Sequence, residues 1–227
     1  MENICLKIVV KVEISTLLDQ HGELDAAGME RMSMVLANLS NSGSQIFIVS
    51  SGSIFLGSKK LGVPDQPDSL VDKQALSAIG QAELMKRYRR YFESYNLMVA
   101  QVLLTGDVFN DPERRNNARN TLTHLARLHV IPVINENDAV STEDIELNDN
   151  YYLVRAVAEL IRANAILIKE MKPGLYSLLS RQAKEPVGML HEDDLIGHLT
   201  TMAPEMNAGE YISKHFPDHI QSLNGEG

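Results

Sequence analysis

Apolar segments of strand length alternate with segments of helical period along most of the chain. Residues 4–12 are rich in Ile and Val without polar alternation, which is typical of a strand covered on both faces. Asp25 can cap the helix that follows, and Gly43 provides its C-terminal stop. The segment QIFIVS at 45–50 predicts the second strand. The apolar positions of the helix between them recur every three or four residues and are Met29, Met32, Leu36 and Leu39.

The same alternation continues through the middle of the chain. A loop with Pro64 and Pro67 leads to a long helix at 72–94. Its predicted apolar face is formed by Ala75, Leu76, Ile79, Leu84, Tyr88 and Tyr91 or Phe92. The elements expected next are a strand at 98–104, a helix at 115–128, a strand at 130–134, a short helix from about 153 and a strand at 165–168. This alternation predicts an α/β fold with a mainly parallel sheet and helices on both faces. After residue 181 the pattern predicts helical patches without a strand, and 223–227 form a disordered tail.

The charge balance narrows the classes of partner. The chain has 227 residues, with 21 Lys and Arg against 30 Asp and Glu, so its formal net charge is −9. This disfavours nucleic acid and anionic membranes as partners, because both attract clustered basic side chains. Phosphate ligands stay compatible, since they need only local cations and backbone N–H groups. No apolar segment approaches the roughly 18 residues of a membrane span, and no signal-peptide pattern precedes the first strand. We therefore expect a cytoplasmic protein.

Cysteine and histidine give no sign of a metal site. Cys5 is the only cysteine and lies in an apolar run, so we expect a buried, inert thiol. The histidines show neither the spacing nor the cysteine partners of a metal centre, and no metal ligands are predicted. They are His21, His124, His129, His191, His198, His215 and His219.

Polar clusters follow four of the predicted strands. They are Lys11 with Ser15 and Thr16, then 50–52 (SSG), 105–107 (TGD) and 135–138 (NEND). Each cluster alone is also typical of ordinary turns and helix caps. Since parallel strands bring their carboxyl ends to one edge of a sheet, four such clusters predict a shared pocket there. Neither G-x-G-x-x-G nor G-x-x-x-x-G-K-[ST] occurs, so dinucleotide-binding and P-loop sites lack their main support.

Four long segments resemble the glutamate 5-kinases of the amino acid kinase family. They are VSSGSIFLGSKKLG at 49–62, QALSAIGQAELM at 74–85, AQVLLTGDVFNDPERRNNARNTL at 100–122 and VIPVINENDAVSTEDIELNDN at 130–150. The resemblance implies a three-layer αβα sandwich. It also implies transfer of the γ-phosphoryl group of ATP, with Mg²⁺, to the side-chain carboxylate of L-glutamate, the first step of proline synthesis. Proline is then a competing inhibitor, no cofactor is tightly bound, and a homo-oligomer is expected.

The resemblance also assigns site residues. For the amino acid it implies Ser51, Gly52, Asn135, Asp138, Asp149 and Asn150. For the nucleotide it implies Lys11, which would clamp the phosphates and act in catalysis, together with Ser15 and Gly174. A lysine and a backbone nest suit this reaction, because phosphoryl transfer between anions depends on positioning and charge neutralisation.

The nucleotide half departs from the family pattern. After the first strand the family has K-V/L-G-S/T-S, whereas this chain has Glu13 and Ile14 in place of the glycine and the Ser/Thr. A carboxylate there opposes phosphate, since like charges about 4 Å apart cost roughly 1 kcal/mol in water and more in a shielded site. The family's GDND is Asn148–Tyr151 (NDNY) here, and its Thr-Asp pair before Gly174 is Glu170-Met171. A later glycine-rich segment with a nucleotide-binding lysine is not found.

Three functions therefore stay open at this point. The first is a glutamate 5-kinase with impaired or altered nucleotide use, and the second is a non-catalytic protein that binds an amino acid or regulates a partner on the same fold. The third is another acyl-phosphate-forming kinase of the family that acts on a different carboxylate or phosphate. The expected organisation is a single kinase-like domain over residues 1–222 with a shortened C-terminal lobe, and without the RNA-binding-type C-terminal domain of many family members.

Overall fold

Strands and helices alternate along the chain as the hydrophobic pattern predicts. The computed structural model describes residues 6–65, 67, 69–141, 151–171, 174–180, 188–202, 206, 210 and 214. Its elements are β1 (Lys7–Val12), the 3-10 helix η1 (Ile14–Leu17), α1 (Ala26–Asn41), β2 (Gln45–Ser50), α2 (Ser53–Leu61), α3 (Leu70–Glu93), β3 (Met98–Leu104), α4 (Asp107–Asn110), α5 (Pro112–Arg127), β4 (Val130–Glu136), α7 (Tyr151–Ile161), β5 (Ala165–Lys169), β6 (Leu175–Leu179), β7 (Gly188–His191) and α8 (Glu192–Thr201).

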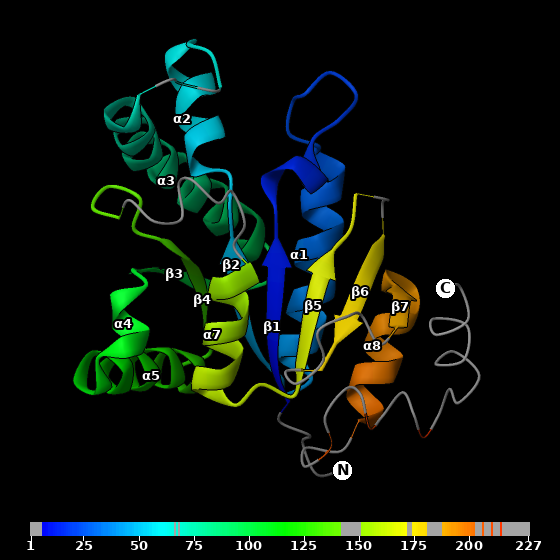
Figure 1. Cartoon of the computed structure of the whole chain (residues 1–227). Helices are drawn as coiled ribbons and strands as arrows, with labels where there is room; N and C mark the ends of the chain where they lie inside the picture. Colours follow the sequence, from blue (N-terminus) through cyan, green and yellow to red (C-terminus); the bar gives the residue numbers. More distant parts are fainter. Residues whose placement is uncertain are drawn as a thin grey trace, which may run out of the picture.

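The strands form one mixed sheet in the order β3-β4-β2-β1-β5-β6-β7. The first five strands of this order are parallel, so their carboxyl ends lie at one edge, the upper one in Figure 1. Strands β6 and β7 then continue the sheet with antiparallel pairings. The prediction that no strand follows residue 181 was wrong, because β7 occupies Gly188–His191. It has four residues, too few to show a hydrophobic period.

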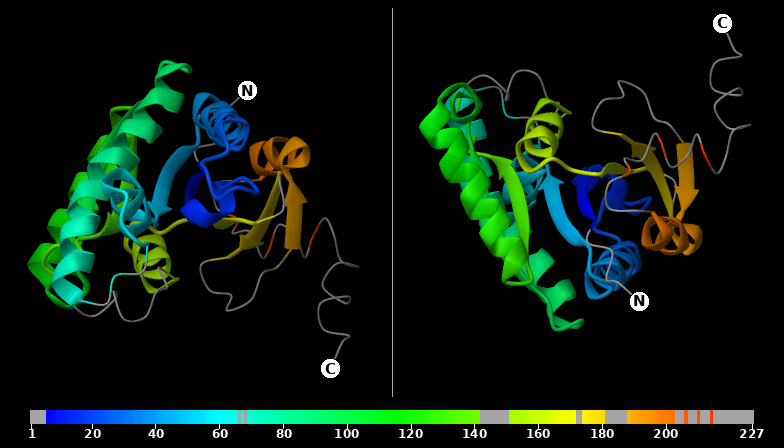
Figure 2. Two further views of the ribbon diagram at one scale, coloured as in Figure 1. Left: turned by 90° about the horizontal axis from the view of Figure 1, so that it is seen from above. Right: turned by 90° about the horizontal axis from the view of Figure 1, so that it is seen from below.

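Helices cover both faces of the sheet, which confirms a three-layer α/β fold. One buried cluster joins alternate residues of β1, such as Val10 and Val12, to α1, α3 and α8. The other joins Val9 and the opposite faces of its neighbours to α5 and α7. Figure 1 shows α1 behind the sheet and α7 in front, and Figure 2 shows the same layers end-on. Among the helices that the structure describes, none combines the length and apolar character needed to span a bilayer.

Local chemistry sets the ends of the helices. The Asp25 carboxylate accepts from the Ala27 N–H and caps α1, as predicted, and Gly43 follows that helix with φ +100°. Helix α5 begins three residues earlier than expected, because Pro112 at its first turn and the Asp111 cap start it there.

The packed face of α3 largely matches the predicted one, since Leu76, Leu84, Tyr88 and Phe92 are buried. Ala75 is exposed and Ile79 only half-buried, whereas Ser77, Gly80 and Gln81 are buried. Small and polar residues therefore share the packed face with Leu76 along the first half of this helix. Sequence periodicity did not identify these small residues, which pack where α2 crosses α3.

A glycine crossing holds α2 against α3. A Cβ atom on Gly57 would overlap the Leu76 carbonyl of α3, and one on Gly80 would overlap the Ser53 carbonyl of α2. Neither helix backbone could retain its position with a larger residue at either place, since cores are packed too closely to absorb the added atom. The two glycines thus fix how near the first turn of α2 comes to α3.

Gly80→Ala tests this crossing. The added methyl group meets backbone atoms rather than a movable side chain, so we expect the free energy of unfolding to fall by about 1–3 kcal/mol or more. Urea denaturation followed by circular dichroism measures the change. Gly197→Ala in α8 is the matched control, because a Cβ there meets no atom within 4 Å. It should be neutral or stabilise the protein by up to about 1 kcal/mol. Equal effects of the two variants would contradict the close crossing.

Candidate functional site

The carboxyl ends of β1 and β2 place the predicted residues side by side. Val12 and Ser50 are register partners at the ends of these strands, and the Ser51 N–H donates to the Val12 carbonyl at 3.1 Å. On its other side β1 pairs with β5, so β1 lies in the middle of the parallel part of the sheet. Ligands of open α/β sheets bind beyond such carboxyl ends. The strand ends therefore lie at one edge of the sheet, as parallel pairing requires, and this edge includes Lys11.

Lys11 is buried, with 2% of its surface exposed, and its charge is compensated within the chain. Its ammonium group pairs with the carboxylate of Glu13, whose side chain is 45% exposed. The ammonium also lies over the ring of Tyr151, 3.8 Å from the ring centre. A cation this deeply buried requires such partners, because removing it from water is costly. Tyr151, the first residue of α7, was not anticipated as part of the site.

Ile14 packs directly on the turn after β2. A Cβ atom on Gly52 would overlap the Ile14 side chain, and Gly52 has φ +96°, so both space and backbone conformation require glycine there. Ile14 is buried in the core on the α1 side, whereas the predicted nucleotide residue Ser15 is exposed beside it. The two departures from the family pattern thus have definite structural roles: Glu13 pairs with Lys11, and Ile14 covers the turn.

Asp138 is held by two serines from different helices. Its Oδ2 accepts from Ser77 Oγ of α3 at 2.6 Å and from Ser53 Oγ of α2 at 3.1 Å. The two hydroxyl oxygens are 2.9 Å apart. Asp138 follows β4, so these hydrogen bonds join the segment after β4 to α3 and to the first residue of α2, just after the turn that follows β2. Neither serine was predicted for the site, although both lie inside the segments that carry the family resemblance.

The strand ends beneath this site are themselves fixed by buried polar contacts. Ser50 Oγ lies 2.9 Å from the Tyr88 hydroxyl, and burial raises the pKa of Tyr88 well above its usual range, with the Ser50 contact acting in the opposite direction. Asn135 is buried in β4, and its side-chain oxygen accepts from the Glu136 N–H at 2.9 Å. Asn135 therefore shapes the end of β4, next to the turn that leads to Asp138.

Gly174, the predicted nucleotide residue beyond β5, packs against the start of α8. It has φ +72°, its carbonyl accepts from the Glu192 N–H at 2.7 Å, and a Cβ there would lie 2.8 Å from His191 Nε2. Nearby, the carboxylate of Glu170 accepts from Ser177 Oγ at 2.5 Å. Burial lowers the pKa of Lys169, whose ammonium donates to the Glu170 carbonyl at 2.7 Å. Glu170 and Met171 thus occupy the place of the family's Thr-Asp pair, and the Glu170 carboxylate is held by Ser177.

The structure brings Lys11, Ser51, Gly52, Asn135 and Asp138 to one edge of the sheet. The predicted substrate residues Asp149 and Asn150 lie outside the described residues. Within the part of the chain that is described, no three His, Cys, Asp or Glu side chains gather closely enough to hold a metal ion. In the expected chemistry Mg²⁺ arrives with ATP as part of the substrate.

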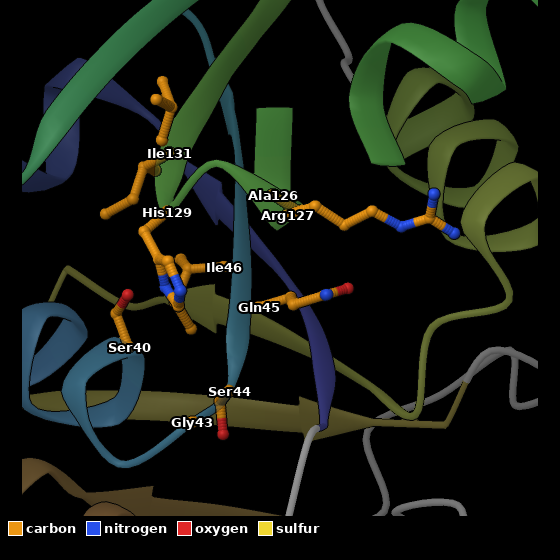
Figure 3. A pocket seen from close by; sticks show the side chains of 10 residues that line it. Ser40, Gly43, Ser44, Gln45, Ile46, Ala126, Arg127, His129 and Ile131 are labelled. Carbon is orange, nitrogen blue, oxygen red and sulfur yellow. The ribbon is translucent and has the colours of Figure 1, made fainter. Parts of the chain in front are cut away.

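A separate hollow of about 220 Å³ lies at the opposite end of the sheet (Figure 3). It is lined by the ends of α1 and α5 and the starts of β2 and β4, including Ser40, Gln45 and His129. Helix C-termini carry the negative end of the helix dipole and therefore disfavour phosphate or carboxylate ligands. Arg127 also lines the hollow, and none of the predicted site residues does.

Comparison with known proteins agrees with this architecture. The sequence profile of the amino acid kinase family matches residues 7–215. The glutamate 5-kinase of Caldanaerobacter subterraneus subsp. tengcongensis is 43% identical over 171 residues, covering 75% of this chain and 46% of that protein. The glutamate 5-kinase of Enterococcus faecalis is 37% identical over 175 residues, covering 75% and 65%. The one of Listeria innocua is 35% identical over 206 residues, covering 89% and 72%.

The chain thus spans less than two thirds of the length of the first two of these relatives. The family match nevertheless covers β1 through α8, which includes all the elements that build the site. Sequence profile, sheet order and site position agree, and the chain belongs to the amino acid kinase family.

Proposed function

We propose that this chain binds L-glutamate, or a closely related amino acid, and transfers to its side-chain carboxylate the γ-phosphoryl group of Mg-ATP. The observation that carries the proposal is the meeting of a buried lysine with an ordered polar turn at adjacent strand ends: Lys11 of β1 and the turn at Ser51 and Gly52 after β2. Asp138, fixed beyond β4, supplies a carboxylate for the amino group of the substrate. The glutamate 5-kinase relatives support the same substrate.

The reaction needs few groups from the protein. A side-chain carboxylate oxygen attacks the γ-phosphorus, the new O–P bond forms, and the bond from phosphorus to the β,γ-bridging oxygen breaks as ADP leaves. The carboxylate is already ionised at neutral pH, so no general base is required. Lys11 stabilises the negative charge that accumulates on the transferring group, which is the largest contribution a site of this kind can make.

The ion pair between Lys11 and Glu13 is the basis of a second candidate function, binding of an amino acid without catalysis. Mg-ATP could use Lys11 only after displacing the Glu13 carboxylate, which offers the ammonium an anion from within the chain. If that displacement does not occur, the domain binds an amino acid without phosphorylating it. Glu13 is almost half exposed, so its side chain has room to turn toward solvent, and this favours the catalytic function.

The two candidates differ in one product. The protein is incubated with L-glutamate, Mg-ATP and hydroxylamine, which converts a γ-glutamyl phosphate into a stable hydroxamate. The catalytic function requires hydroxamate and ADP in equal amounts, each dependent on L-glutamate. Binding of L-glutamate by calorimetry without hydroxamate would establish the non-catalytic function, and absence of both would refute the proposal.

Lys11→Met tests the phosphate clamp while retaining an unbranched apolar side chain. We expect kcat for hydroxamate formation to fall by about 100-fold or more, because a charge-stabilising donor is removed from the transition state. Binding of L-glutamate should persist, and calorimetry would show that the site still forms. Lys59→Met is the control, since Lys59 is an exposed lysine that pairs with Glu23. An unchanged kcat in Lys11→Met would exclude this role.

Glu13→Gln tests whether the carboxylate competes with nucleotide. Removing the negative charge beside Lys11 should tighten Mg-ATP binding by about tenfold, as expected for a charge pair at this distance in a partly shielded site. The dissociation constant is measured by calorimetry. Glu23→Gln removes the same charge from a position on the protein surface and should have little effect. Equal effects of the two variants would mean that only net charge matters.

A further inference from the structure

Two buried hydroxyl groups converge on one oxygen of Asp138. Ser77 Oγ is 2.6 Å and Ser53 Oγ 3.1 Å from Asp138 Oδ2, and the two serines are 1% and 3% exposed. Their oxygens are also 2.9 Å from each other. Each hydroxyl has a single proton, so both serines can donate to the carboxylate only when neither donates to the other. The short Ser77 contact identifies Ser77 as the stronger donor.

This arrangement depends on the crossing of α2 and α3. Ser53 is the first residue of α2, and Ser77 lies one turn before Gly80, whose missing side chain allows the Ser53 carbonyl to approach α3. The preceding residue, Gly52, has no side chain and makes no cap. The carboxylate therefore lies near the N-terminal end of a nine-residue helix, where the helix dipole favours negative charge.

The role of the two serines concerns Asp138 rather than the helices that carry them, because both hydroxyls donate to its carboxylate. A hydrogen bond to a charged group contributes more than one between two neutral hydroxyls, so the contacts to Asp138 outweigh the contact between the two serines. The two hydroxyls, from two different helices, hold one oxygen of the carboxylate, Oδ2. A carboxylate fixed before the ligand arrives loses less freedom on binding, which increases affinity for a cation of matching geometry.

We propose that Ser77, assisted by Ser53, is a positioning residue that orients the Asp138 carboxylate toward the α-ammonium group of the ligand. The site thereby selects α-amino acids over dicarboxylic acids of the same length that have no amino group. This inference rests on the proposed function, in which Asp138 receives the amino group. It adds the residues that make the recognition of that group specific.

The experiment compares two ligands that differ only in the amino group. Binding of L-glutamate and of glutarate to the whole chain is measured by calorimetry for the unaltered protein and for Ser77→Ala. The unaltered protein should bind L-glutamate more tightly than glutarate. In Ser77→Ala, L-glutamate should bind about tenfold more weakly, as expected for losing a hydrogen bond to a charged group, while glutarate binding stays the same.

Ser58→Ala is the matched control. Ser58 is a buried serine of the same helix as Ser53, and its hydroxyl has no hydrogen-bond partner among the residues that the structure describes. This variant should leave the ratio of the two affinities unchanged. If Ser77→Ala does not give a cooperative unfolding transition, Ser53→Ala is used instead, and its longer contact predicts a smaller loss in the same direction.

Each other outcome has a definite meaning. Equal weakening of both ligands in Ser77→Ala would show that the serine only supports the fold and would overturn the inference. Glutarate binding as tightly as L-glutamate to the unaltered protein would overturn it too, because Asp138 would not be recognising the ammonium group. Failure of the unaltered protein to bind L-glutamate would refute the proposed function itself, and this failure is visible before any variant is made.

Discussion

Strand β1 pairs in parallel with β2 and β5, and its register decides where a charged side chain enters an otherwise apolar sheet. Val10 and Val12 face the core on the α1 side, whereas Lys11 points to the other face and meets Tyr151 of α7. A shift of one residue would exchange these faces and place the ammonium group among apolar side chains. The register of β1 therefore fixes the lysine, the turn after β2 that meets it and the edge of the sheet on which ligands can bind.

Charge compensation at that edge links folding to ligand binding. Burying an ammonium group as deeply as that of Lys11 is costly without a nearby anion or aromatic ring, and Glu13 and Tyr151 provide both within the chain. The same requirement makes the site attractive to an anionic substrate, which competes with Glu13 for one ammonium group. On the amino-acid side, the two serines that hold Asp138 are neutral hydroxyl donors. The nucleotide side of the site thus already has an anion on its lysine, whereas on the amino-acid side the carboxylate is held by neutral donors.

Much of the fold could be predicted because its central strands are continuous apolar runs and its helices have strong caps. The strands at 45–50 and 98–104 and the cap at Asp25 follow from local chemistry alone. Helix α2 and strands β6 and β7 were not predicted, since short elements show no clear period. Most of the packed face of α3 was predicted, but the exposure of Ala75 and the burial of Gly80 were not, because an apolar period does not encode the close crossing with α2.

The sequence by itself determined the α/β class, the family resemblance and the two unusual residues after β1, because each depends on neighbours along the chain. What Glu13 and Ile14 do there was decided by the tertiary structure: one pairs with Lys11 and the other covers Gly52. The contacts of Asp138 likewise join residues 61 and 85 positions apart. No local pattern encodes such contacts, since they exist only when two helices and a strand end are packed to within hydrogen-bonding distance.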